Sequence, residues 1–271
     1  MRKLKIYLPF FKNQFKSIFA YRLNTLLWII CDLLAPFISF YLWNAIYGSA
    51  AGDTLGGLTQ PEMIVYVFIS FVVSQVVTVG IASYMRDDIW EGAVAMMLIK
   101  PIDYRLSLIS RAASNAIFNF VIPGVFVWAG IEVYKALVLG IAAVTVANAF
   151  LFLLSVIMSF LIYVLFDFCF GMVAFVTTHY FGLSMIKSAI LSFLSGALIP
   201  ISFFPGALQT VFEMLPFSSM IYAPVMVYLG KYSGLELVFV LVRQLLWVII
   251  LYALGSLLWR KVTKRLTILG G

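Results

Sequence analysis

The sequence predicts an all-α polytopic membrane protein with a single transmembrane domain over residues 1–271. Of its residues, 64% are hydrophobic and only 11% are charged, whereas a soluble domain carries about 25% charged residues. The mean hydropathy of +1.08 leaves little polar sequence for a soluble domain. Span-length apolar runs and a one-sided distribution of Lys and Arg predict six membrane-spanning helices with both termini in the cytoplasm.

Residues 1–22 are predicted to form an amphipathic helix that lies on an anionic membrane surface. Lys and Arg side chains occupy one face, and the helix is expected to bend at Pro9. We reject a secretory signal because the basic region is too long and the next apolar run, about 23 residues, exceeds the 7–15 of a signal core. The apolar face has helical spacing and consists of Leu4, Leu8, Phe11, Phe15 and Ile18.

Apolar runs locate the six spans, and Pro61 favours a helix start after an exposed glycine-rich loop over 48–60. Glu132 and Lys135 indicate a short turn after the third span. The turn between the fourth and fifth spans is expected at 177–182, around His179. The predicted spans are 23–46, 61–85, 106–130, 143–172, 184–201 and 236–259.

The positions of the basic residues set the orientation. With the N-terminus in the cytoplasm, all but three of the 18 Lys and Arg residues fall on the inner side. The exceptions are Lys135 and Lys231, which fall outside, and Arg243, which falls within the sixth span. This asymmetry follows the positive-inside rule. It also accounts for the net charge of +7, so no basic face is left for nucleic acid.

A polar stretch over 85–104 lies between the second and third spans, on the predicted cytoplasmic side. Asp88 and Glu91 have the form of an N-terminal cap pair, and Pro101 should stop a helix at about Lys100. We therefore expect one amphipathic helix over 88–100. Such a helix is either a lever through which a partner moves both spans or a loop helix resting among the lipid headgroups.

A long apolar segment over 195–230 is too broken by proline and glycine to form one span. Irregular backbone at membrane depth persists only when it is buried in protein or lines a water-filled cavity. We therefore expect two short helices, 205–214 and 217–228, that enter the outer leaflet and return. The segment is either a lid over a cavity or a structural plug.

Catalytic signatures are missing from the sequence. It contains no phosphate-binding Gly-rich loop ending in Lys-Ser/Thr, no Gly-x-Ser-x-Gly and no His-Glu-x-x-His. His179 has no Cys/His partners for a metal site, and Cys31 and Cys169 lie in apolar runs, as free thiols do. We expect neither an enzyme nor a cofactor site.

Three ionisable residues fall within predicted spans: Asp32, Asp167 and Arg243. Charged groups at membrane depth are costly and usually face the interior of a bundle. They are either a proton relay, which would make the chain an ion-coupled secondary transporter, or structural pairs. A third possibility, an assembly or immunity factor that does not transport, rests only on the missing catalytic residues.

Two sequence patterns follow the basic N-terminal helix in order along the chain. The first joins Ile89-Trp90-Glu91-Gly92 to Leu98-Ile99-Lys100-Pro101-Ile102. The second is a proline series: Leu194-Ser195-Gly196, Ile199-Pro200, Phe204-Pro205, Leu215-Pro216-Phe217 and Tyr222-Ala223-Pro224. In this order and topology, essentially the whole chain resembles the permease subunit of ABC-2 type ABC transporters, in the branch whose ATPase is a separate chain.

The resemblance implies a coupling helix within 86–105 that docks on an ABC ATPase subunit, which binds the ATP and Mg²⁺. It also implies a second permease subunit, location in the cell membrane and export of an amphiphile such as a drug, lipid, glycolipid or peptide. The coupling residues would be Asp87, Asp88, Ile89, Trp90, Glu91, Gly92, Met97, Leu98, Lys100 and Pro101. The extracellular gate would comprise Gly196, Pro200, Pro205, Pro216 and Phe217.

Overall fold

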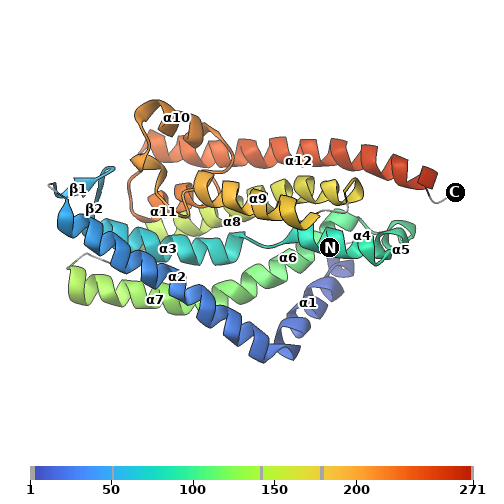
Figure 1. Cartoon of the computed structure of the whole chain (residues 1–271), viewed down its shortest axis with the longest axis horizontal. Helices are drawn as coiled ribbons and strands as arrows, with labels where there is room; N and C mark the ends of the chain where they lie inside the picture. Colours follow the sequence, from blue (N-terminus) through green and yellow to red (C-terminus); the bar gives the residue numbers. More distant parts are fainter. Residues whose placement is uncertain (1–3, 51, 141–142, 178–179, 270–271) are drawn as a thin grey trace.

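The computed structural model describes residues 4–50, 52–140, 143–177 and 180–269, with side chains described as far as Lys264. Within these residues, five helical stretches are long and apolar enough to cross a membrane. They run roughly along the long axis of the molecule (Figure 1). This confirms an all-α membrane protein. The five stretches are Arg22–Ser49, Gln60–Trp90, Tyr104–Leu139, Val146–Phe175 and Leu235–Lys264.

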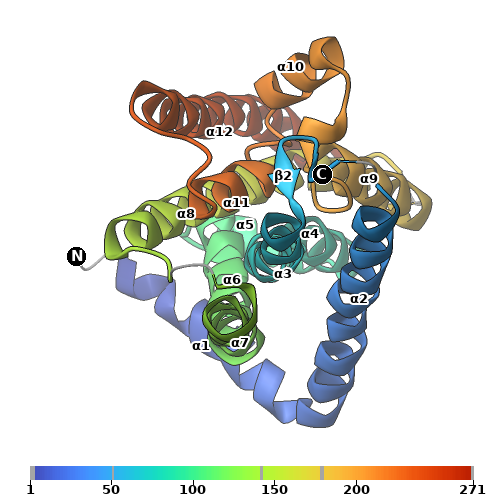
Figure 2. The ribbon, with the colours of Figure 1, turned by 90° about the vertical axis from the view of Figure 1, so that its left-hand side faces the viewer.

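The N-terminal segment begins with a short turn, Leu4–Ile6, followed by helix α1 (Leu8–Ala20). Pro9 lies in the first turn of α1, so it starts the helix instead of bending it, because a helix start does not need the missing N–H group. Helix α1 lies across α6, while α2 (Arg22–Ser49) rises from its end (Figure 2). The Ser110 hydroxyl donates to the Tyr7 carbonyl at 2.9 Å and ties this segment to α6.

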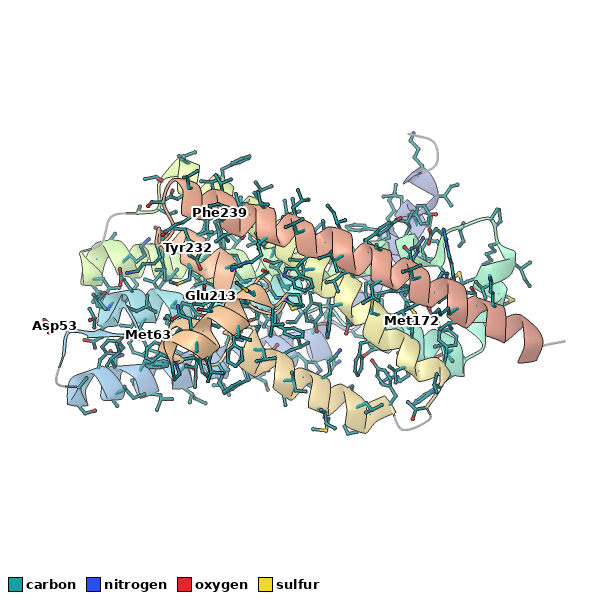
Figure 3. All side chains as sticks on the ribbon, turned by 90° about the horizontal axis from the view of Figure 1, so that it is seen from above. Asp53, Met63, Met172, Glu213, Tyr232 and Phe239 are labelled. Atoms are coloured by element: carbon teal, nitrogen blue, oxygen red, sulfur yellow. The ribbon has the colours of Figure 1, made fainter. Side chains whose placement is uncertain are left out.

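The loop after α2 contains a hairpin of two short strands, β1 (Thr54–Leu55) and β2 (Leu58–Thr59), in which Thr54 pairs with Thr59. Helix α3 (Gln60–Val77) starts in a capping box, since Thr59 and Glu62 each bond the other's backbone N–H. Asp53 before the hairpin and Met172 near the other end of the bundle are labelled far apart in Figure 3.

The second predicted span is two helices. The helix breaks at 78–80 and resumes as α4 (Ile81–Trp90), and Asp167 accepts a hydrogen bond from the Ala82 N–H at 2.8 Å. A carboxylate at this point satisfies one of the N–H groups that a helix start leaves unpaired, and it favours the positive end of the helix dipole. The fold therefore tolerates a break inside the membrane domain.

The third span is longer than predicted. It comprises α6 (Tyr104–Asn119), a π-helical turn at Phe120–Gly124, α7 (Val125–Tyr134) and a second π-helical turn at Lys135–Leu139. The turn predicted at Glu132 and Lys135 is wrong, because these residues pair within the helix at 2.9 Å. A pair three residues apart stays on one helix face and reduces the cost of both charges.

Helix α8 (Val146–Gly171) continues as a 3₁₀ turn at Met172–Phe175 and packs against α12 (Leu235–Leu269). Between them, buried Gln244 donates to Ser159 Oγ and to the Ser219 carbonyl, both at 3.0 Å. The predicted fifth span, 184–201, is instead α9 (Tyr180–Leu194), which ends early because Gly196 turns the chain with a φ of +81°. His179 lies outside the described residues.

The broken segment forms two short helices, α10 (Gly206–Met214) and α11 (Tyr222–Tyr228). The first matches its predicted range, but the second starts five residues later than 217, since 216–221 form turns after Pro216. Every residue of α11 is buried, mainly against α8 and α3, whereas α10 buries none. The segment thus consists of a buried helix, α11, which we call the plug, and the more exposed helix α10 before it.

Candidate functional site

The polar stretch after α3 folds as an elbow, defined here as α4, the Glu91–Gly92 turn and α5 (Ala93–Ile99). The expectation of one helix over 88–100 is wrong: Asp88 lies inside α4, and the new helix starts at Gly92, whose φ of +72° suits a residue without a side chain. Helix α5 ends before Lys100 and Pro101, as predicted. The elbow lies at the same end of the molecule as both described chain ends (Figure 1).

Large apolar side chains project from the elbow into the surroundings. Trp90 is 57% exposed and Ile99 is 85% exposed, and Met96 and Leu98 are also exposed. Exposed apolar groups that cluster beside charges are typical of protein–protein contacts. Of the ten predicted coupling residues, Glu91, Gly92, Lys100 and Pro101 are exposed as well, whereas Asp87, Ile89 and Met97 are half-buried.

Asp88 differs from the other predicted coupling residues in being buried, so most of its surface faces the protein itself. Its carboxylate accepts hydrogen bonds from the Tyr104 hydroxyl at 2.9 Å and from Arg111 at 3.1 Å. The Arg111 guanidinium also lies 4.4 Å from the centre of the Tyr84 ring. This cluster fixes the elbow to α6.

We predict that Arg111→Met loosens the elbow. The substitution leaves the Asp88 carboxylate without its cation, and a hydrogen bond to a charged group contributes about 1.5–3 kcal/mol. Hydrogen exchange should become faster at amides 84–92 and stay unchanged in α11. Lys231→Met, which breaks the more exposed pair with Glu62, is the matched control. Equal protection of the elbow in both variants would contradict this role for Arg111.

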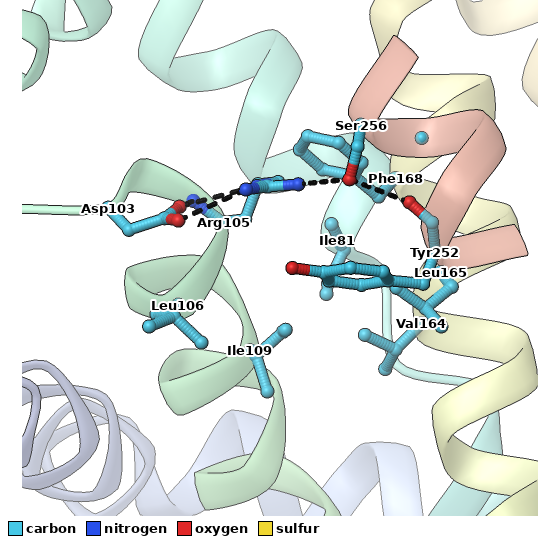
Figure 4. Close-up of a pocket in the computed structure, with 11 residues that line it drawn as sticks. Ile81, Asp103, Arg105, Leu106, Ile109, Val164, Leu165, Phe168, Tyr252 and Ser256 are labelled. Carbon is cyan, nitrogen blue, oxygen red and sulfur yellow. Dashed lines mark hydrogen bonds and ion pairs between the residues drawn. The ribbon is translucent and has the colours of Figure 1, made fainter. Parts of the chain in front are cut away.

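A second set of contacts joins the start of α6, just after the elbow, to α12. Arg105 lies between Asp103, to which it donates at 3.2 Å, and Ser256, to which it donates at 2.6 Å (Figure 4). Its guanidinium also lies 5.5 Å from the centre of the Tyr252 ring. These residues border a small cavity of about 90 Å³ whose remaining lining is mostly apolar. The elbow is therefore attached to α6, which is in turn attached to α12, and it continues α3.

The predicted gate residues lie in the segment that leads from α9 to the buried helix α11. Gly196 lies in a tight site, where the Tyr66 hydroxyl donates to its carbonyl at 2.6 Å and the Tyr222 N–H donates to the Ser195 carbonyl at 2.9 Å. Pro200 and Pro205 precede the short helices at Ile201–Phe203 and Gly206–Met214. The Phe217 ring packs edge-on against Phe166 of α8 at 5.4 Å, and Pro216 opens the turn before α11.

Asp32, Asp167 and Arg243 are not brought together: among the described residues, no ion pair or hydrogen bond joins any two of them. Asp167 is fully buried and forms an ion pair with Lys187 of α9. Asp32 accepts a hydrogen bond from Gln75 at 3.2 Å. Arg243 Nε and Nη2 are buried without a hydrogen bond to the described chain.

Comparison with known proteins agrees with the membrane architecture. A model of the ABC-2 family of transporter proteins matches residues 33–270. The chain therefore belongs to the ABC-2 family, and it is a multi-pass permease, the membrane component of an ABC transporter and not itself the ATPase. No individually curated protein matches the chain.

Proposed function

We propose that the chain is the permease subunit of an ATP-driven exporter of an amphiphilic substrate and that its elbow docks on a separate ATPase subunit. The observation that carries the proposal is the exposed apolar surface of Trp90, Met96, Leu98 and Ile99 at the inner end of the bundle. ATP and Mg²⁺ belong to that partner. A second permease subunit, either the same chain or a related one, completes the transporter.

The anchors of the elbow support a mechanical role. A push on the elbow would pass to α6 through Asp88 and Arg111, and from α6 to α12 through Arg105 and Ser256. Residues 195–217, with Gly196, Pro200, Pro205, Pro216 and Phe217, form the extracellular gate in this proposal. Movement of the spans would release the plug from α3 and α8. The basic termini and the elbow face the cytoplasm of a cell membrane.

Site-specific photocrosslinking tests the docking surface. A photoreactive residue at Ile99 should crosslink to a chain that binds an azido analogue of ATP, and one at Val146 should not. Val146 is similarly exposed, at 88%, and begins α8 near the other end of the bundle. Crosslinks from position 99 that reach only lipid would overturn the proposal.

A double substitution measures how much the exposed apolar side chains contribute to association with the ATPase. Trp90→Ala with Ile99→Ser should weaken association with the ATPase by about thirtyfold or more, because buried aromatic and apolar anchors contribute about 2 kcal/mol or more at interfaces. Copurification and stimulated ATP hydrolysis measure the loss. The control, Val146→Ser, should leave both unchanged.

A further inference from the structure

Two adjoining cavities with many hydroxyl groups lie between α2, α3 and α9. The first, of about 340 Å³, separates α2 from α3. The second, of about 310 Å³, separates α3 from α8 and α9. Ser74, Thr78 and Ala197 border both. Among the described residues no Lys, Arg or His lines either one, so the polar groups found facing this space are a carboxylate, hydroxyls and an amide.

The carboxylate is that of Asp32, which lies about 15 Å from the start of α2 at 1.5 Å per residue, well within the thickness of a bilayer. Its hydrogen bond from Gln75 neutralises no charge, and no basic side chain pairs with it in the described chain. Five other carboxylates on the long helices form an ion pair with Lys or Arg, namely Glu62, Asp87, Asp88, Glu132 and Asp167, whereas Glu236 in the first turn of α12 has none in the described chain. The Asp32 charge therefore lacks a cationic partner.

The hydroxyl groups present acceptors to the same space. The Thr78 hydroxyl donates to the Ser74 carbonyl at 2.6 Å, and the Ser188 and Ser192 hydroxyls donate to carbonyls one turn earlier in α9. A hydroxyl whose proton is used by its own helix keeps oxygen lone pairs for a ligand. Ser70 borders the first cavity and is only 3% exposed, and its Oγ makes no hydrogen bond of normal geometry in the described chain, although the Tyr66 hydroxyl is nearby.

Apolar side chains complete the walls, among them Met63, Phe71 and Leu198 of the first cavity and Leu191 and Ile221 of the second. Ala197 and Leu198 belong to the turn that joins α9 to the short helix Ile201–Phe203, within the proposed gate segment. A ligand in this space would therefore lie directly beneath the proposed gate. It would meet an unpaired negative charge, hydrogen-bond acceptors and an apolar surface together.

We propose that these cavities bind the substrate and that the substrate is an organic cation with an apolar body, neutralised by Asp32. The inference rests on the proposed export function and gives it a substrate class. The unpaired carboxylate disfavours anions, and the apolar walls favour a ligand larger than an inorganic ion. Asp32 is thus a binding residue of the transport path.

Equilibrium binding to the purified full-length permease in phosphatidylcholine nanodiscs tests the site without any ATPase. The probes are tetraphenylphosphonium and tetraphenylborate, which share size and shape but carry opposite charge. We expect the cation to bind and the anion not to compete. Asp32→Asn should raise the Kd of the cation about ten- to a hundredfold, the value of a lost charged contact, whereas Asp32→Glu should retain most of the affinity.

Asp53→Asn, in the loop before the hairpin, removes the same charge elsewhere and should leave the Kd unchanged. If Asp32→Asn unfolds, Ser74→Ala with Thr78→Val removes acceptors from both cavities and should also weaken binding. Equal affinity for both probes, or an unchanged Kd in the folded Asp32→Asn protein, would overturn the site. The binding assay contains no ATPase, so neither of these two results depends on whether the elbow docks on one. A failure of this site is therefore distinguishable from a failure of the proposed docking.

Discussion

Replacing Lys187 with Met is expected to destabilise the folded protein by about 3–5 kcal/mol, because it leaves a buried carboxylate without its cation. The side chain of Asp167 is completely buried, and that of Lys187 is only 10% exposed. The carboxylate also accepts the Ala82 N–H at the start of α4. The pair therefore joins α8 and α9 to α4, the first helix of the elbow.

Equilibrium unfolding in mixed detergent micelles measures this loss, and a double variant separates charge from packing. Asp167→Asn with Lys187→Met removes both charges and keeps an acceptor for the Ala82 N–H, so its stability should return to within about 1–2 kcal/mol of the native protein. The control Lys231→Met breaks an ion pair whose side chains are both more than a quarter exposed, and it should cost at most about 1 kcal/mol.

Two results would contradict a structural role for this pair. One is a double variant as unstable as Lys187→Met alone, since packing would then account for the loss. The other is a native-like Lys187→Met protein that no longer transports, which would assign Asp167 and Lys187 to the transport step and revive ion coupling. If the single variant is destabilised and the double variant is not, Asp167 is held in its ion pair with Lys187. Asp32 then remains the carboxylate available to a ligand.

The sequence predicted the long helices well, because an apolar run of span length has few structural alternatives. Five of the six predicted spans start within three residues of the first residue of a long helix, and Pro61 lies in the first turn of α3 as expected. The prediction of α10 also succeeded, since Pro205 supplies a local start signal. These features depend on neighbouring residues alone.

Features that depend on distant partners could not be predicted in this way. Asp88 has the local pattern of a cap, but Arg111, 23 positions further along, holds it inside α4. The break at 78–80 is stabilised by Asp167, 85 positions from Ala82. Glu132 and Lys135 indicated a turn only because their pairing with each other, and the contact of Glu132 with Tyr228, were not visible in the sequence.

Gly196→Val is expected to destabilise the protein by about 2–5 kcal/mol and to detach the plug, because it combines steric overlap with backbone strain. A Cβ atom at this position would lie 2.9 Å from Tyr222 Cβ and 3.0 Å from the Tyr66 hydroxyl oxygen. The overlap costs about 1–3 kcal/mol, and the φ of +81° adds about 1–2 kcal/mol for a residue with a side chain. Because Tyr222 begins α11, the displacement should expose the whole plug.

Two other glycines separate these costs. Gly57 has a similar φ of +75°, but no atom lies within 4 Å of the position that a Cβ would take there, so Gly57→Ala reports the backbone strain alone. Gly206 has neither strain nor neighbours, and Gly206→Ala should be nearly neutral. Stability should therefore fall in the order Gly206→Ala, Gly57→Ala, Gly196→Ala and Gly196→Val, with faster hydrogen exchange in α11 only for the last two. If Gly196→Ala matched Gly57→Ala in both measurements, contact with Tyr222 and Tyr66 would not hold the plug, and the gate would have to be sought at Pro216 and Phe217.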